Sequence, residues 1–85
     1  MSHNIWSSHQ TALQQLMRSL RCGAALTQQE LAALLGKPQS YVSKYESGER
    51  KLDIVELREV CLKCGISLES FAHRFEIVLA QGEKQ

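Results

Sequence analysis

The stretch TQQELAALLGKPQSYVSKYES, residues 27–47, decides the fold because it carries the signals that begin and end two short helices. Thr27 is a good N-cap, and Glu30, three residues later, completes a capping box that opens the first helix. Gly36 can adopt the left-handed conformation that ends a helix. Pro38 suits the first position of a second helix, where its missing N–H would have no partner. The stretch therefore predicts two helices joined by a tight turn.

Each of these two predicted helices has an apolar face. Leu31, Leu34 and Leu35 form that face at helical spacing in the first helix. In the second helix, Val42 and Tyr45 are expected to face inward. The outward face of the second helix is polar and consists of Gln39, Ser40, Ser43 and Lys44. A helix, a turn with glycine and a second helix with short polar side chains is the layout of a DNA-binding helix-turn-helix.

A further helix is predicted before this stretch, from about residue 8 to residue 22. Apolar residues recur there at helical spacing, namely Leu13, Leu16, Met17 and Leu20. The opposite face is polar and is made of Gln14, Gln15, Arg18 and Arg21. Residues 1–7 show no period, so we expect a flexible N-terminal tail.

Two more helices are predicted after the stretch. Asp53 caps the fourth helix with help from Glu56, and Ser67 caps a fifth helix that runs to about residue 80. The inner face of the fourth helix is formed by Leu57, Val60, Cys61 and Cys64. The apolar stripe of the fifth helix is formed by Leu68, Phe71, Ala72, Phe75, Val78 and Leu79. The chain therefore predicts one all-α domain of five helices over residues 8–80, followed by a flexible tail of residues 81–85.

Charge is distributed unevenly along the chain. Residues 1–51 carry six Lys/Arg against three Asp/Glu, a net charge of +3, and residues 52–85 carry four against six, a net charge of −2. The positive half contains the predicted helix-turn-helix, and a DNA-facing surface needs local positive potential more than a basic chain. No apolar run approaches the roughly 20 residues of a membrane span, and the N-terminus has no secretory pattern. We therefore expect a cytoplasmic protein.

Three cysteines, Cys22, Cys61 and Cys64, are too few for a disulfide scaffold. The spacing of Cys61 and Cys64 permits a metal or redox interpretation, but no second Cys/His pair lies at finger-like spacing. We favour small buried thiols on the inner face of a helix, and expect no metal and no cofactor. No nucleophile is paired with a base and no phosphate-binding glycine loop occurs, so we do not expect an enzyme.

The run LTQQELAALLGKPQSYVSKYESGERKLD, residues 26–53, closely resembles the lambda-repressor/Cro-like helix-turn-helix proteins, also called the XRE family. The resemblance extends from about Leu13 to Phe75. The chain departs from the family at Ala25, where such proteins often have glycine. The resemblance implies a five-helix domain that dimerises on palindromic DNA and regulates transcription, with recognition helix 38–47 in the major groove.

The resemblance also implies DNA contacts at matching positions. We expect base contacts from Gln39, Ser40, Ser43 and Lys44. Among these, Gln39 best matches adenine, and Lys44 can reach guanine or a phosphate. We expect contacts with the DNA backbone from Gln28, Tyr41, Tyr45, Arg50 and Lys51. Two alternatives stay open: Tyr41 can instead cover the core, and the polar face of the second helix can be merely solvated. Glu46 is expected to pair locally, since DNA would repel its charge.

The fifth helix has more apolar surface than a terminal helix of so small a domain needs. We expect it both to close the core and to contact a second subunit through Phe71, Phe75, Val78 and Leu79. The first functional hypothesis is a homodimeric, sequence-specific regulator that binds double-stranded DNA. Phage-type repressors, restriction–modification controllers and antitoxins all include such small proteins. The alternative is an antitoxin-type interaction module that uses the same fold to bind a toxin or another protein partner.

Overall fold

The computed structural model describes residues 5–83, which form five α-helices and no strand. These are α1 (Ile5–Gly23), α2 (Gln28–Leu35), α3 (Gln39–Ser47), α4 (Ile54–Lys63) and α5 (Leu68–Glu83). The all-α prediction is confirmed. α1 begins three residues before the predicted start and takes in residues 5–7, whereas residues 1–4 lie outside the described part. α5 likewise extends three residues beyond the predicted end at residue 80.

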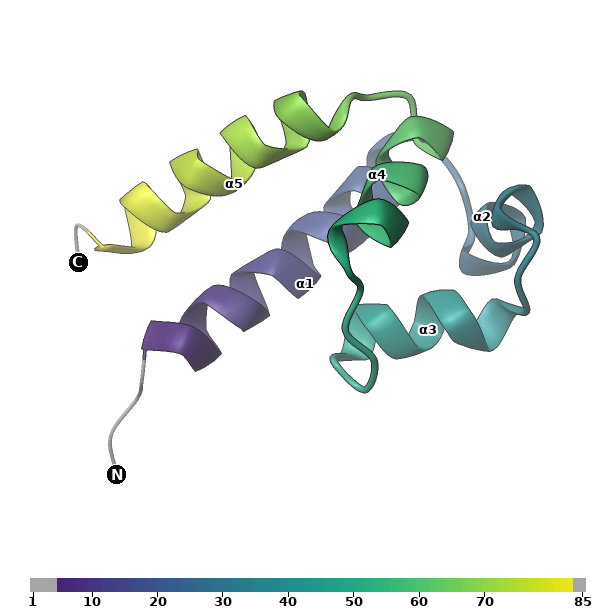
Figure 1. Cartoon of the computed structure of the whole chain (residues 1–85), viewed down its shortest axis with the longest axis horizontal. Coiled ribbons are helices and arrows are strands. Elements are labelled where there is room, and N and C mark those ends of the chain that lie inside the picture. Colours follow the sequence, from purple (N-terminus) through teal and green to yellow (C-terminus); the bar gives the residue numbers. More distant parts are fainter. Residues whose placement is uncertain (1–4, 84–85) are drawn as a thin grey trace.

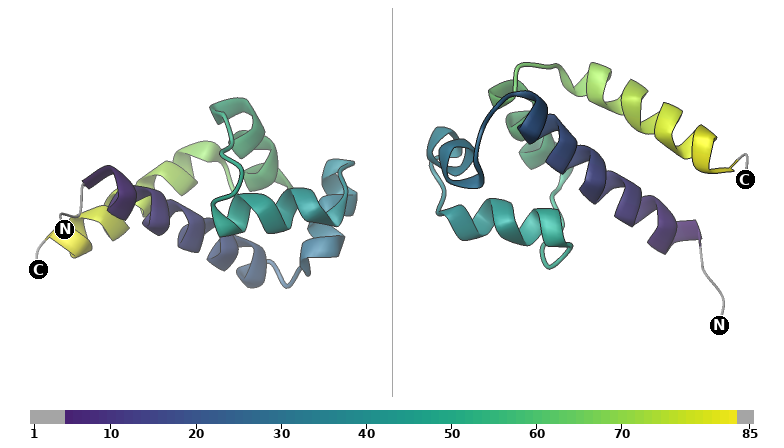
Figure 2. Two further views of the ribbon diagram at one scale, coloured as in Figure 1. Left: turned by 90° about the horizontal axis from the view of Figure 1, so that it is seen from below. Right: turned by 180° about the vertical axis from the view of Figure 1, so that it is seen from behind.

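The helices form two groups in space. α1 and α5 pack side by side and extend together away from α2, α3 and α4, as the views in Figures 1 and 2 show. α2 packs on both α3 and α4, and α3 also packs on α1. In Figure 1, α3 lies at the lower right of the domain, below α2 and α4.

The predicted capping signals for α2 are present. The Thr27 hydroxyl accepts the Glu30 N–H at 3.0 Å, and the Glu30 carboxylate accepts the Thr27 N–H at 2.8 Å. Gly36 ends α2 in the left-handed region with φ of 69°. Pro38 occupies the N-cap of α3 with φ of −71°, one position before the predicted first helical position. Its fixed φ suits either position, and the turn between the two helices is one residue longer than predicted.

The later helices are capped as predicted too. The Asp53 carboxylate accepts the Glu56 N–H at 2.8 Å, and the Glu56 carboxylate accepts the Asp53 N–H at 2.9 Å. The Ser67 hydroxyl accepts the Ser70 N–H at 3.0 Å at the start of α5. Gly65, with φ of 91°, reverses the chain between α4 and α5. These local bonds fix the helix boundaries before any tertiary contact is considered.

Ala25 adopts the backbone conformation that glycine would normally supply. Its φ is 60°, and it is the one residue other than glycine with a positive φ in the described chain. This conformation costs an L-residue about 1 kcal/mol. Alanine at this position, where the family often has glycine, therefore adds local backbone strain.

The core contains side chains from all five helices. Its buried members are Met17, Leu20, Leu31, Ala32, Val42, Tyr45, Val60, Cys61 and Phe71. The predicted apolar face of α2 is partly wrong, because Leu34 is 51% exposed and Ala32 is buried in its place. Phe71 is only 2% exposed, so it lies in the core of the domain and has little surface left for the predicted subunit contact. The predicted inner faces of α1, α3 and α4 are confirmed.

The prediction of a buried thiol is confirmed at Cys61, which is fully buried, while Cys64 is half-buried. Burial raises the pKa of the Cys61 thiol to about 11. Within residues 5–83, no group of three or more His, Cys, Asp or Glu side chains is placed to bind a metal ion. The helices of this described part include none long and apolar enough to cross a membrane.

Candidate nucleic-acid interface

The rotation of α3 is fixed by its two inward side chains. Val42 and Tyr45 are both 0% exposed and lie in the core. The opposite side of the helix is open to solvent, where Gln39, Ser40 and Lys44 are exposed and Ser43 is half-buried. The outward polar face therefore lies where the sequence predicted it. This face is the part of α3 that can approach the edges of bases.

A buried ion pair connects α1 to the end of α3. The Arg21 guanidinium donates to both carboxylate oxygens of Glu46, from Nε to Oε2 at 2.7 Å and from Nη2 to Oε1 at 3.1 Å. The side chains of Arg21 and Glu46 are only 10% and 5% exposed. Arg21 Nη1 also donates to the Leu26 carbonyl at 2.9 Å, so this arginine holds the connection between α1 and α2 as well. The hydrogen bonds from Arg21 to Glu46 raise the pKa of the guanidinium.

This pair corrects one sequence prediction and confirms another. Arg21 was assigned to the solvent face of its helix, whereas it is buried. Glu46 was expected to pair locally, and it does. Arg21 directly follows Leu20, which the sequence placed on the inner face of the helix. This neighbour indicates that Arg21 can lie near the core, but helical periodicity alone does not identify Glu46 as its partner. An arginine that donates bidentately to a carboxylate is a specific and charge-assisted contact.

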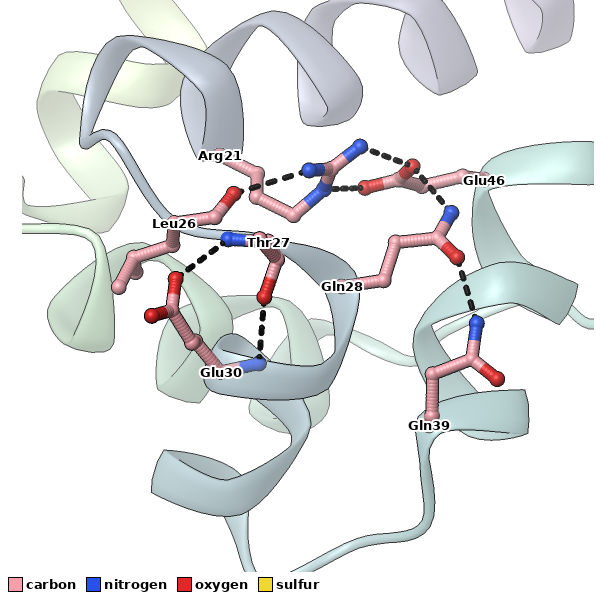
Figure 3. Close-up of polar contacts among 7 residues, drawn as sticks. All are labelled: Arg21, Leu26, Thr27, Gln28, Glu30, Gln39 and Glu46. Atoms are coloured by element: carbon pink, nitrogen blue, oxygen red, sulfur yellow. Dashed lines mark hydrogen bonds and ion pairs between the residues drawn. The ribbon is translucent and has the colours of Figure 1, made fainter.

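Two glutamines extend the chain of hydrogen bonds that begins with this ion pair. Gln28 Nε2 donates to Glu46 Oε1 at 3.0 Å, and Gln39 Nε2 donates to Gln28 Oε1 at 2.7 Å. Figure 3 shows the four side chains in a row, from the end of α1 to the start of α3. We call Arg21, Glu46, Gln28 and Gln39 the polar relay. It ties the N-terminus of α2 to the N-terminus of α3, which are 11 residues apart in sequence.

An open pocket of about 510 Å³ lies beside the polar relay. It is lined by Thr27, Gln28 and Gln29 at the start of α2, together with Arg21 and Gln39. The first N–H groups of a helix lack intrahelical partners and attract anions. The pocket therefore offers an anion access to the amino end of α2. Gln28, which the sequence predicted as a backbone contact, is one of the residues that line this pocket.

A second cluster surrounds Tyr41 on the side of α3 that faces α4. Two cations lie over the Tyr41 ring, with Lys37 Nζ 5.4 Å and Arg50 Cζ 4.9 Å from the ring centroid. Arg50 Nη2 also donates to Glu56 Oε2 at 2.6 Å. Burial raises the pKa of the Tyr41 hydroxyl, and its ring packs against the core. Of the two interpretations left open for Tyr41, contact with the core is therefore confirmed.

Tyr45 is too deeply buried to make the predicted contact with a phosphate. Its hydroxyl is buried and has no hydrogen-bond partner among the described residues. Burial raises the pKa of this hydroxyl well above its ordinary value. The Tyr45 ring meets the Tyr41 ring edge-on, with centroids 5.7 Å apart. We therefore correct the assignment of Tyr45 from a DNA contact to a core residue.

Away from α3, an apolar groove of about 500 Å³ lies where α1, α4 and α5 meet. Leu13, Ile54 and Phe75 are among its lining residues. Ile54 is 67% exposed and its neighbour Val55 is 70% exposed, which is unusual for adjacent β-branched residues. The sequence had assigned Phe75 to a subunit contact but missed both Ile54 and Val55. Val78 and Leu79, also predicted in that contact, are half-buried on α5.

These features define the class of the protein: it is a helix-turn-helix domain built like those that bind DNA. A helix-turn-helix family model matches residues 17–73. A solved structure titled "XRE-family like protein" from Pseudomonas syringae pv. tomato str. DC3000 is 40% identical, covering 86% of this chain and 89% of that chain, with a TM-score of 0.80. The chain belongs to the XRE family of helix-turn-helix proteins. A search of curated proteins finds no match.

Proposed function

We propose that the protein is a sequence-specific transcriptional regulator that binds a palindromic operator as a homodimer in the cytoplasm. The observation that carries this proposal is the outward polar face of α3, held in place by the buried Val42 and Tyr45. Gln39, Ser40, Ser43 and Lys44 would contact bases in the major groove. Gln28, Arg50 and Lys51 would contact the DNA backbone. The role is one of binding, with no catalytic step.

The first experiment measures binding to DNA selected from a randomised duplex library. A dimer with Arg50 and Lys51 on phosphates would release four or so counterions, so its affinity should fall about 10²-fold between 50 and 200 mM salt. Lys51→Ala should reduce this salt slope, whereas Lys63→Ala, on α4, serves as the charge-matched control. The proposal would be contradicted if the protein selected no DNA sequence, or if its affinity for DNA did not change with salt concentration.

The apolar groove supports the homodimer. A domain of this size buries a modest core, and an open apolar groove gains stability when a second subunit covers it. Two recognition helices on one face of the duplex need to lie roughly 34 Å apart. Sedimentation should show a dimer that Phe75→Asp converts to monomer. Leu34→Asp, at an exposed leucine far along α2, should leave the dimer intact. If the Phe75→Asp variant remained dimeric, the subunit interface would lie elsewhere on the domain.

The same groove favours one alternative, an antitoxin-type module that binds a different protein. In that case the chain would co-purify with an unrelated partner from its native cell extract. Phe75→Asp would abolish that capture, and binding to DNA would be unaffected. A homodimer as the sole species under the same conditions would argue against the alternative.

A further inference from the structure

We propose that Gln14 of α1 is a positioning residue, which holds the loop between α3 and α4 so that Arg50 and Lys51 are preorganised for the DNA backbone. The inference rests on the proposed DNA-binding function. It deepens that function by assigning a role to α1, a helix that supplies none of the proposed DNA contacts. The loop consists of residues 48–53, between the two helices.

The face of α1 that packs on α3 has a polar residue at each end. Gln14 and Arg21 are seven residues apart, so they lie on the same side of the helix. Arg21 bonds to Glu46 near the end of α3, and Gln14 lies against Gly48, the C-cap of α3. Gln14 is half-buried, whereas its neighbour Gln15 is exposed. Gln14 is therefore a second polar link between α1 and the end of α3.

Gly48 leaves room for the Gln14 side chain because it has no side chain of its own. A Cβ at Gly48 would overlap Gln14 Nε2 and would lie 3.0 Å from Gln14 Cδ. At Gly36 and Gly65, the other described glycines with positive φ, a Cβ would meet nothing within 4 Å. The close approach of another helix is therefore specific to Gly48 and is not a general property of the helix ends.

On the side of α3, the loop is fixed by its own hydrogen bonds. The Arg50 N–H donates to the Lys44 carbonyl at 3.1 Å, and the Ser47 hydroxyl donates to the same carbonyl at 3.1 Å. These bonds hold the loop to α3. On the side of α1, the contact of Gln14 with Gly48 holds it.

The contact with Gln14 matters because Gly48 is the most flexible part of this loop. Its φ is 88°, and glycine has more backbone freedom than any other residue type. The three heavy atoms nearest to its missing Cβ all belong to Gln14, apart from the neighbours of Gly48 in the chain, so truncation of Gln14 would open space there. The loop would then lose its freedom on binding DNA instead of on folding, which weakens binding.

The test compares Gln14→Ala with Gln14→Met on the operator duplex selected from the randomised library. Gln14→Ala should weaken binding about fivefold, because the loop is then ordered only on binding. Gln14→Met fills the same space with an unbranched side chain and should bind within about twofold of wild type. Gln15→Ala, at the exposed neighbour, is the matched control. Preference among operator variants should persist in all three, because Val42 and Tyr45 fix the rotation of α3.

A measurement without DNA follows the loop directly. The Arg50 N–H is bonded to the Lys44 carbonyl, so its hydrogen exchange reports how often the loop opens. Gln14→Ala should speed exchange at Arg50 roughly tenfold and leave exchange at the buried Val60 of α4 within about twofold of wild type. Equally faster exchange at both residues would indicate a general loss of stability and would overturn the positioning role.

The failure of this inference and that of the proposed function are distinguishable. If wild type selects no DNA sequence, the proposed function fails. If wild type selects one and Gln14→Ala binds it as tightly, the inference about Gln14 alone is overturned. Equal losses of affinity in Gln14→Ala and Gln14→Met would indicate a polar contact of Gln14 with DNA and would overturn it too.

Discussion

Two Arg–Glu pairs lie on opposite sides of α3, and they differ in how much of each pair water reaches. Arg21 and Glu46 are 10% and 5% exposed and join at 2.7 Å, whereas Arg50 and Glu56 are 44% and 29% exposed and join at 2.6 Å. The N–O distances are thus nearly equal. Burial, rather than distance, distinguishes the two pairs.

Burial changes what each pair does. A buried charge that loses its partner stays without solvent, so the whole cost falls on folding. An exposed charge that loses its partner is solvated instead, and such pairs contribute little to stability. The pair of Arg21 and Glu46 therefore fixes α1, α2 and α3 relative to one another. Under the proposed function, Arg50 of the exposed pair would exchange Glu56 for a DNA phosphate.

The largest effect should come from breaking the buried pair. Glu46→Ala leaves Arg21 buried without its carboxylate, so we expect a loss of about 3–5 kcal/mol in the free energy of unfolding. That is a large share of the stability of a small domain. Chemical denaturation followed by circular dichroism measures it. A loss below about 1 kcal/mol would show that water reaches this pair as readily as the other.

The double substitution Arg21→Met with Glu46→Leu should recover most of that loss. Apolar side chains of similar volume often replace a buried ion pair at little cost, because neither charge remains to be desolvated. Denaturation of the double variant beside both single variants gives the coupling energy. If the double variant is no more stable than Glu46→Ala, the pair contributes packing that these replacements do not supply.

Breaking the exposed pair should instead leave stability nearly unchanged and strengthen DNA binding. Glu56→Gln keeps the capping bond to Asp53, since glutamine also completes a capping box, so its melting temperature should stay close to that of wild type. Removal of the carboxylate beside Arg50 should strengthen DNA binding about threefold at low salt. Glu59→Gln, an exposed change of the same charge on α4, is the control. Weaker binding by Glu56→Gln would mean that Glu56 is needed to orient Arg50.

The pH dependence of this exposed pair has a definite sign. The backbone N–H of Asp53, followed by Arg50, lowers the pKa of Glu56 below its ordinary value of 4.5. A carboxylate with a lowered pKa contributes stability that is present above its unfolded pKa and is lost as pH falls through its folded pKa. Any small difference in melting temperature between wild type and Glu56→Gln should thus shrink as pH falls below 4.5 and vanish once the pH is below the lowered pKa of folded Glu56. If the difference in melting temperature persisted at that low pH, its cause would be packing and not the charge of Glu56.

The smallest effect should come from Tyr45, which directly precedes Glu46 of the buried pair in α3. Tyr45→Phe removes a buried hydroxyl that has no partner among the described residues, so stability should stay the same or rise by up to about 1 kcal/mol. DNA affinity should not change. A clear loss of affinity would restore the hydroxyl to the DNA interface and contradict its burial.

Much of the candidate site was predictable because it depends on local rules. Gly36 and the capping box at Thr27 place α2 and the start of α3, and Val42 with Tyr45 gives the rotation of α3. The burial of Ala32 in place of Leu34 was not predictable. α2 has only eight residues, so several faces carry apolar side chains and the neighbouring helices decide which is buried.

The sequence by itself determined the helices, their caps and the polar face of α3, because hydrogen bonds within a few residues and a 3.6-residue period decide these. Only the tertiary structure decided that Arg21 is buried against Glu46, 25 residues away, and that Gln28 bonds to Gln39. Such pairings depend on how whole helices cross, which no local pattern encodes. Membership of the XRE family follows from the first set, and the buried ion pair that holds α1, α2 and α3 relative to one another belongs to the second.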